Sequence, residues 1–480
     1  MTSYSATRAT TSGATPTGVV AGVAALLVVV VMGQIDMFVV NLAGPAIQRS
    51  LGADFGQAQF VIDAYVAAYA AGLVTWGRLG DRVGARRVLL AGLAGFTLGS
   101  LLCALAPTPA TLIASRALQG IGASAMAPQV LSLLRHMFPD PERRDRALSA
   151  YGSAIGFGVV AGLAGGGLLL HADVAGLGWR ALFLVNVPVG IAAVAAIRYA
   201  VPERPPLPGP RLDVGGAALT ALVLPALLLP PALLAEQETP TRPLLCLAVA
   251  VLLCAALVRQ QRRTQQRRGA EPLFAPDLLG DTGFRRAMVV VCCFYAGNAG
   301  LFLVFTYHLQ AGLGLGQLAA GLVFVPLGVG FLAGSAVSGR FGNRGMTFGG
   351  WVMTACLLGA AASVLAPVDG QPPLLAVVVG VSGFGQGLVV ARLVSAVLAR
   401  VPSERAGSGA GVLHTVTQAS MALGVVVAGA LYRLVLGADP VADPSGAPLL
   451  GDATAFAATT VLLAAAATAV AVRTRRLNPA

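Results

Sequence analysis

The sequence predicts an all-α membrane protein with fourteen membrane-spanning helices. Composition is the first observation behind this fold class: of 480 residues 56% are hydrophobic, only 11% are charged, and the mean hydropathy is +0.79. A soluble globular chain of this length is much less apolar. The second observation is that the apolar residues fall into runs of about 20, the length that a helix needs to cross the hydrocarbon core of a bilayer.

Fourteen such runs follow one another along the chain. They cover residues 18–45, 58–77, 87–106, 110–136, 147–170, 181–200, 213–235, 243–259, 286–309, 317–339, 347–366, 373–399, 408–436 and 453–473. The first run follows Arg8 and resembles a signal peptide in this respect. Thirteen further runs, and Asp36 near the end of the first, predict that it is retained as a helix.

The arginines give the orientation of these helices. If the N-terminus is cytoplasmic, 26 of the 32 basic residues lie on the cytoplasmic side and two lie within spans; the outer side receives four, Arg49, Arg180, Arg242 and Arg433. Cytoplasmic loops of membrane proteins carry such an excess. We therefore expect both termini in the cytoplasm, in the cytoplasmic (inner) membrane of the cell. The net charge of +12 is then a consequence of topology, and nucleic acid is not an expected partner.

Several function classes are disfavoured by residue usage. All basic residues are arginine, so the chain lacks the lysine of a phosphate-binding loop or of a Schiff base. The six cysteines lie inside apolar runs, without the spacing of a disulfide framework or a metal site. The loops are too short for a catalytic or receptor domain. We expect no enzyme activity, no cofactor and no metal, and a proton gradient as the source of energy.

Two connectors divide the chain. Residues 201–211 are rich in proline and predict a stiff link, whereas residues 259–286 carry seven arginines and predict a solvated connector close to anionic lipid headgroups. The predicted division is a six-helix bundle over residues 1–200, linkers with two extra helices over 201–270, and a second six-helix bundle over 271–480.

An internal repeat supports two related bundles. Residues 77–86 align with 335–344 at an offset of 258, and residues 120–139 align with 383–402 at an offset of 263. Asp36 and Gln48 match Asn298 and Gln310 at 262, in the same order. Because Asp36 and Asp81 have no acidic counterpart in the second copy, ionisable function is expected in the first. Transporters built from repeats place the substrate site between the two halves.

Four motifs lie on the expected spans. The loop after the second span contains Gly77, Asp81, Arg82, Gly84, Arg86 and Arg87. The fourth span contains Arg116, Gln119, Gly120, Gly122 and Ala123, and the first contains Asp36, Val39, Asn41, Ala43 and Pro45. The fifth span contains Gly158, Gly162, Gly166 and Gly167. With these motifs the chain resembles the major facilitator superfamily, and within it the fourteen-helix drug:proton antiporter branch. Leu163 departs from that branch, which has proline there.

The resemblance implies a major facilitator fold and assigns roles to the motifs. It implies that Asp81 closes the cytoplasmic side by reaching the start of the eleventh helix of the common twelve-helix core and nearby arginines. A carboxylate at a helix N-terminus gains about 0.3–1 kcal/mol, which agrees with this role. Gly80 and Gly84 are expected to allow a tight turn. The glycines of the fifth span serve either close packing alone or a pliable gate.

Charged groups inside the membrane are costly and usually functional. Asp36, Asp63 and Arg116 are therefore the expected sites of proton and substrate coupling, together with Asn41. For Asp36 the alternative is a structural hydrogen bond to a neighbouring helix, and for Asp63 it is exposure near the outer boundary. Further candidates for lining a cavity are Gln119, Asn298, Gln386, Arg392, His414 and Gln418. Hydrogen bonds between helices would explain most of them. Arg392 instead needs an acid, a lipid headgroup or substrate.

The expected function is proton-coupled efflux of lipophilic or cationic drugs by alternating access. The expected partners are a small-molecule substrate, protons and the lipid bilayer, and we expect a monomer. One alternative is a dedicated exporter of a single metabolite or self-made antibiotic. The other is an uptake symporter, which the glycines of the fifth span disfavour.

Overall fold

The computed structural model describes residues 16–138, 140–203, 213–235, 241–266, 280–342, 344–398, 400–401, 406–437, 440 and 451–475. Within these ranges the chain is helical and contains no strand. The first part comprises α1 (Pro16–Leu51), α2 (Phe55–Val83), α3 (Ala85–Ala104), α4 (Pro109–Met137), α5 (Pro141–Ala172), α6 (Arg180–Leu184) and α7 (Asn186–Ala200). Two helices follow, α8 (Val214–Ala235) and α9 (Thr241–Gln266). The last part comprises α10 (Thr282–Tyr307), the π-helix η3 (His308–Gly312), α11 (Gln317–Val323), α12 (Val325–Phe341), α13 (Arg344–Ala362), α14 (Gln371–Leu398), α15 (Ala406–Leu436) and α16 (Asp452–Arg475).

The fourteen predicted spans each correspond to a helix or to a pair of consecutive helices. Thirteen of them are long and apolar enough to cross a membrane over the described residues. The fourteenth span corresponds to α8, whose described apolar stretch, Gly215–Leu227, is shorter than this length. The predicted all-α membrane fold is confirmed.

Proline interrupts two of the predicted spans. Residues 180–200 form α6 and α7 with a break at Val185, and residues 317–341 form α11 and α12 with a break at Phe324. Pro188 and Pro326 follow these breaks within the first turn of the second helix. Proline has no N–H to donate to the preceding turn, which explains both interruptions.

The loop predicted between the second and third spans is almost absent. α2 continues to Val83 and α3 begins at Ala85, so that Gly84 alone makes the turn, with a φ of 108°. Gly80 lies inside α2 and faces the side chain of Gln129 on α4, where a β-carbon would collide. The tight turn was thus predicted correctly for Gly84, whereas Gly80 serves the contact between α2 and α4.

The internal repeat is visible in helix packing. Gly92 of α3 and Gly122 of α4 face each other, since a β-carbon on either would meet backbone of the other helix. In the second copy, Gly349 of α13 and Gly385 of α14 do the same. These positions differ by 257 and 263 residues, close to the offsets in the sequence. Both copies therefore bring the same pair of helices together through the same pair of glycines.

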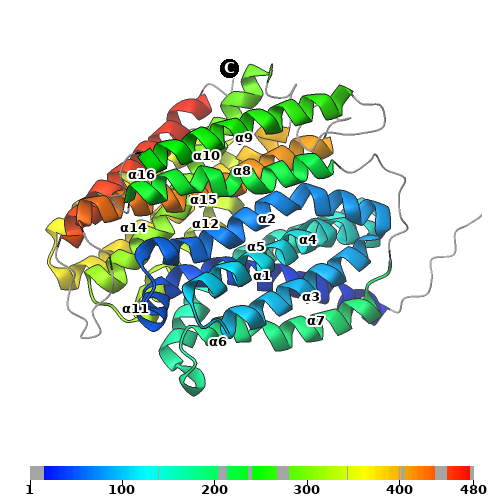
Figure 1. The fold of residues 1–480 in the computed structure, drawn as a ribbon, viewed down its shortest axis with the longest axis horizontal. Helices are drawn as coiled ribbons and strands as arrows, with labels where there is room; N and C mark the ends of the chain where they lie inside the picture. The colour runs from blue at the N-terminus through cyan, green and yellow to red at the C-terminus, as the bar shows by residue number, and fades with distance from the viewer. Residues whose placement is uncertain are drawn as a thin grey trace, which may run out of the picture.

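Figure 1 shows the helices of the first copy, in blue and cyan, gathered on one side of the molecule and those of the second copy, yellow to red, on the other. α8 packs against α9, and also against both α2 and α15. The two sides meet along α2 with α15, α5 with α11 and α12, and α1 with α10. The bundle boundaries predicted at residues 200 and 270 stay a prediction.

One end of the molecule is closed by contacts between the two sides. The hydroxyl of Tyr307 donates to Oε1 of Gln48 at 2.9 Å, and Nε2 of Gln310 donates to the carbonyl of Leu42 at 3.0 Å. The ring of Phe55 packs edge-on against Tyr307 at 4.9 Å. We call these contacts the outer closure, because α1 ends and α2 begins at the end of the molecule that the arginine distribution predicts to be extracellular.

The glycine contact between α3 and α4 yields a stability prediction. In Gly122→Ala the new methyl group meets backbone atoms of α3 that cannot move aside, and such overpacking costs about 1–3 kcal/mol. The matched variant is Gly95→Ala on α3, where the nearest atom to an added β-carbon is 3.8 Å away. Thermal unfolding of the purified protein in detergent should show a lower midpoint for Gly122→Ala and an unchanged or higher midpoint for Gly95→Ala. Equal midpoints for the two variants would contradict the packing described here.

Candidate functional site

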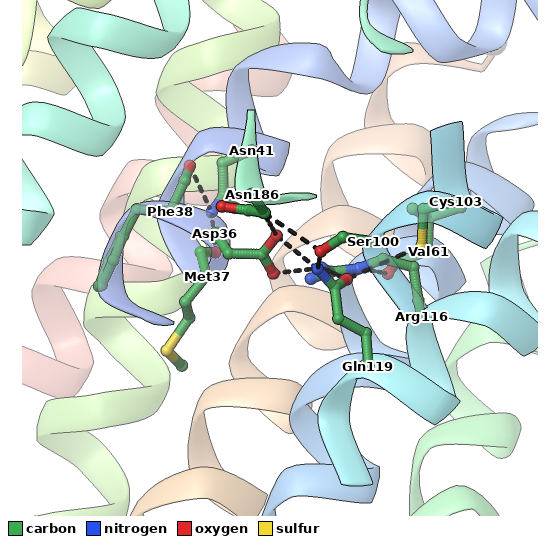
Figure 2. A network of polar contacts seen from close by, with 10 residues as sticks. All are labelled: Asp36, Met37, Phe38, Asn41, Val61, Ser100, Cys103, Arg116, Gln119 and Asn186. Atoms are coloured by element: carbon green, nitrogen blue, oxygen red, sulfur yellow. Dashed lines mark hydrogen bonds and ion pairs between the residues drawn. The ribbon is translucent and has the colours of Figure 1, made fainter. Parts of the chain in front are cut away.

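An ion pair lies inside the first bundle. Nη1 of Arg116 on α4 is 2.6 Å from Oδ2 of Asp36 on α1, and both side chains are fully buried. The two residues come together because α1 and α4 contact each other, and Figure 2 shows the two side chains pointing toward one another. The sequence singled out both residues, and the structure brings them together.

Polar side chains from two further helices complete the network around Asp36. Gln119, one turn after Arg116, donates to Oδ1 of Asp36 at 2.7 Å, and Asn186 of α7 donates to the same oxygen at 2.9 Å. Ser100 of α3 receives hydrogen bonds from Gln119 at 2.6 Å and from Asn186 at 3.3 Å (Figure 2). Each oxygen of the Asp36 carboxylate therefore has at least one donor.

The guanidinium group of Arg116 is held on several sides. Nη1 also donates to Oε1 of Gln119 at 2.6 Å, and Nε donates to the carbonyl of Val61 on α2 at 3.1 Å. The ring of Tyr65 lies 4.2 Å from the guanidinium carbon, and that of Phe183 lies 5.7 Å from it. An aromatic face attracts a cation at this distance. Charge and hydrogen-bonding groups are thus matched within the network, which is what burial requires.

Asn186 and Ser100 were missed by reasoning from the sequence. Asn186 lies in the sixth predicted span, 181–200, and belongs to none of the four motifs. A polar residue just before the proline that breaks this span was the available signal. Ser100 gave none, because serine is ordinary in membrane helices.

Asn41 is not part of this network. Its amide group donates to the carbonyls of Met37 and Phe38 in its own helix, at 3.4 and 3.2 Å. Although Asn41 lies only five residues after Asp36, the described contacts turn its side chain back to α1 (Figure 2). No described contact of Asn41 supports its expected role in coupling.

Asp63 of α2 is in the opposite situation from Asp36. Its side chain is only 1% exposed, and neither carboxyl oxygen has a hydrogen-bond partner among the described residues. Exposure near the outer boundary, the alternative considered from the sequence, is therefore wrong. Gln59, one turn earlier on the same face of α2, donates to the carbonyl of Val425 on α15 at 3.4 Å. Asp63 thus lies on the face of α2 that packs against the second bundle.

A pocket opens beside the ion pair, inside the first bundle. Its wall is formed by α1, α2, α4 and α5 and includes Tyr65, Tyr69, Tyr151, Met37 and Met126. Tyr65 lines the pocket, and its ring also packs against Arg116. An aromatic ring is therefore the partition between the pocket and the ion pair.

The glycines of the fifth span bring α5 onto α1. A β-carbon at Gly158, Gly162 or Gly166 would meet α1 at Gln34, Ile35 and Val39, respectively. The fourth, Gly167, faces α11 of the second bundle. Close packing accounts for the first three contacts, and only Gly167 lies where the two bundles meet. The side chain of Leu163 lies outside the described residues.

The motif at the predicted cytoplasmic end pairs with a residue that the sequence did not single out. Glu203, just after α7, lies 3.5 Å from Nε of Arg86 and 3.8 Å from Nε of Arg87. Arg86 also donates to the carbonyl of Val201 at 2.9 Å. Arg82 and Asp81 are exposed at the end of α2. The predicted contact of Asp81 with the start of α15 lies outside the described part of the chain, which omits residues 402–405 and the side chains of 406–411.

The candidates in the second bundle form no comparable network among the described residues. Arg392 of α14 donates to the carbonyls of Ser338 and Gly339, at 3.3 and 3.2 Å, at the C-terminal end of α12. Cations favour such a helix end. Among the other candidates, Asn298 is half-buried, Gln386 and Gln418 are buried, and His414 is exposed.

Comparison with known proteins places these features in a family. The family model of the Major Facilitator Superfamily matches residues 25–425. The chain is 34% identical to the probable actinorhodin transporter of Streptomyces coelicolor, over 86% of this chain and 72% of that protein. It is 34% identical to the puromycin resistance protein pur8 of Streptomyces alboniger, over 89% of this chain and 85% of that protein.

Solved structures are similar in fold. A bacterial homolog of the human lysosomal transporter Spinster, in an inward-facing and unoccupied conformation, superimposes with a TM-score of 0.68 at 16% identity. The match covers 98% of this chain and all of the other. At this identity the comparison supports the arrangement of helices and nothing more specific.

The ion pair gives a testable coupling energy. In Arg116→Met the Asp36 carboxylate is left without its cation, and in Asp36→Asn the buried guanidinium is left without its anion. Losing one partner of a buried pair costs about 3–5 kcal/mol, whereas replacing both costs much less. Thermal unfolding of the two single variants and the double variant should therefore show a double-variant loss well below the sum of the single losses. Additive losses would mean that the two residues do not act as a pair.

Proposed function

Because the chain belongs to the Major Facilitator Superfamily, we propose that it exports lipophilic or cationic drugs or antibiotics across the cytoplasmic membrane in exchange for protons. It is a multi-pass membrane transporter of small molecules and not an enzyme. Export and drug chemistry are supported by relatives described as resistance, export or efflux proteins. Proton exchange is supported by the buried carboxyl group of Asp63, which has no hydrogen-bond partner among the described residues.

Asp63 is the proposed proton carrier. An ionised carboxylate without a hydrogen-bond donor is very costly to bury, so Asp63 carries a proton while α2 and α15 are packed together. When the two bundles separate at the outer end, this face of α2 meets water and the group can exchange its proton. Closing the outer end therefore requires a proton on Asp63. This requirement couples proton uptake from outside to the return of the empty transporter.

Asp36 and Arg116 have a different role in this proposal. They fix α1 and α4, together with α3, α7 and the backbone of α2, as one unit that moves as a whole. The ring of Tyr65 transmits occupancy of the pocket to Arg116, because the same ring contacts both. A substrate that displaces this ring therefore shifts Arg116, and with it the unit that the ion pair holds together.

The pocket supports the proposed substrate class. Tyrosine faces attract organic cations, and methionine adapts its shape to different apolar molecules. The pocket combines three tyrosines and two methionines with small apolar residues of α1 and α4. Its volume is about 50 Å³, whereas pockets for drug-sized molecules hold roughly 300 Å³ or more, so binding requires the surrounding helices to move apart. Each proton that moves inward down a membrane potential of 100 mV releases about 2.3 kcal/mol, which is available for moving such a molecule outward.

A dedicated exporter is the second candidate. The names of two relatives each refer to a single compound: the probable actinorhodin transporter, and the tetracenomycin C resistance and export protein of Streptomyces glaucescens, which is 31% identical over 86% of this chain and 76% of that protein. Others are called multidrug resistance proteins. Expression in a host without its own pumps, followed by susceptibility to a panel of unrelated compounds, separates protection against one chemical class from protection against many.

Proton coupling is tested by efflux from loaded vesicles. Purified protein in liposomes should move a fluorescent cationic dye against its gradient when the proton gradient has the physiological direction, and an uncoupler should abolish this movement. Undiminished transport after the uncoupler would rule out proton-driven export. Accumulation of the dye on the side that the protons flow into would instead indicate the uptake symporter.

The role of Asp63 is tested by Asp63→Asn. Because Asp63 has no partner among the described residues, the amide should leave the thermal unfolding midpoint nearly unchanged. It should abolish efflux driven by a proton gradient and retain exchange of labelled for unlabelled substrate. The matched control is Asp140→Asn at the exposed start of α5, where asparagine also caps the helix and transport should persist. Normal gradient-driven efflux by Asp63→Asn would remove this residue from the mechanism.

A further inference from the structure

A second cluster of buried ionisable side chains lies in the second bundle. Asp452, the first residue of α16, accepts a short hydrogen bond from the hydroxyl of Tyr432 on α15. The other oxygen of Asp452 lies 2.5 Å from Nδ1 of His308, where α10 passes into η3. All three side chains are buried. We call them the outer cluster, because they lie at the same predicted extracellular end of the helices as the outer closure.

One face of the His308 ring packs against an apolar side chain, and one ring nitrogen has no hydrogen-bond partner among the described residues. Its ring stacks on Phe456 with the centroids 3.7 Å apart and an angle of 14°. Nε2 is buried and has no partner among the described residues. A third ionisable side chain near His308, besides Asp452 and Tyr432, is that of Tyr307. Tyr307 directly precedes His308 and interacts electrostatically with Tyr432.

The outer cluster is joined to the outer closure through a short stretch of chain. Tyr307, which bonds to Gln48, is the residue before His308, and Gln310, which bonds to the carbonyl of Leu42, is two residues after it. The bond between His308 and Asp452 therefore fixes η3 to α16 while η3 fixes α10 to α1. A change in the outer cluster acts directly on contacts between the two bundles.

The net charge of the outer cluster depends on one proton. With Nδ1 donating to the Asp452 carboxylate and Nε2 unprotonated, the imidazole is neutral and the cluster carries a charge of −1. A proton from extracellular water that binds to Nε2 forms an imidazolium ion and makes the pair neutral overall. Burial of a net charge costs more than burial of a matched pair. The proton-loaded cluster is therefore compatible with a closed outer end, and the unloaded cluster favours access of water.

We infer that the outer cluster is a second proton-binding site, and that a proton bound there from the extracellular side stabilises the closed outer end. The site shares no residue with the proton carrier proposed above and needs no substrate, so either can be wrong without the other. It also changes an expectation from the repeat: the second bundle lacks counterparts of Asp36 and Asp81, but it contains an acid of its own at the start of α16.

Hydrogen–deuterium exchange of the full chain in lipid nanodiscs tests this inference without substrate or gradient. Peptides covering 42–52 and 307–316 report on the outer closure, and a peptide covering 100–106, at the outer end of α3, corrects for the chemical effect of pH. The measurement should span about pH 5 to 8. In the wild-type protein, corrected exchange at the outer closure should increase as the pH rises.

Three variants separate titration from structure. His308→Asn keeps an N–H donor near Nδ1 but cannot take up the second proton, and Asp452→Asn removes the charge that this proton neutralises. Both should weaken the pH dependence of exchange at the outer closure, and in the Asp63→Asn background both should lose it. Tyr432→Phe removes only the hydroxyl group and should retain it. The matched control, His171→Asn, changes an exposed histidine at the outer end of α5 and should behave as the wild-type protein does.

Two results would overturn the inference. One is a wild-type protein whose corrected exchange at the outer closure does not change with pH. The other is an unaltered pH dependence in His308→Asn or, where that variant does not fold, in Asp452→Asn. The measurements are repeated in an Asp63→Asn background, where the dependence should persist. Its loss in that background would assign the titration to Asp63 and contradict the outer cluster as the site.

Discussion

The ion pair between Asp36 and Arg116 is the interaction on which the first bundle depends. A guanidinium group buried in the membrane has to be matched by an anion and by acceptors for its remaining donors. Here the anion comes from α1 and the acceptors from α2 and α4, while Asn186 and Ser100 stabilise the carboxylate and its neighbours. The glycines of α5 and the facing glycines of α3 and α4 allow the backbones to come close enough for these contacts. Polar matching and close packing thus support the same arrangement.

The contrast with Asp63 explains how one bundle can hold two carboxyl groups with different tasks. Asp36 has donors for both oxygens and stays inside one rigid unit, whereas Asp63 has none among the described residues and lies on a face that packs against α15. Groups whose environments differ in this way take different protonation states. A transporter needs both: a fixed pair that defines the moving unit, and a group whose proton depends on whether the interface is open. The outer cluster adds a histidine with comparable dependence on the other side of that interface.

Much of this arrangement could be predicted from the sequence, and there are physical reasons why the rest could not. Hydropathy and arginine distribution gave the fourteen spans, and the cost of burying charge identified Asp36, Asp63 and Arg116. Asn186 and Asp452 were missed because their partners are distant in sequence and each residue taken alone is ordinary at a helix end. The carbonyl partners of Arg392 could not be predicted, since a sequence does not show that a helix C-terminus ends beside it. Asn41 was included because of a motif, but its contacts are local.

The protonation state of Asp63 is the most direct test of the account. Infrared difference spectroscopy of the purified protein in lipid, comparing wild type with Asp63→Asn at neutral pH and without substrate, measures the carbonyl stretch of a protonated carboxyl group. The account predicts a band in the wild-type protein that is missing from the variant. If the wild-type protein instead shows the carboxylate bands of an ionised Asp63, the proposed dependence of outer closure on this proton is wrong.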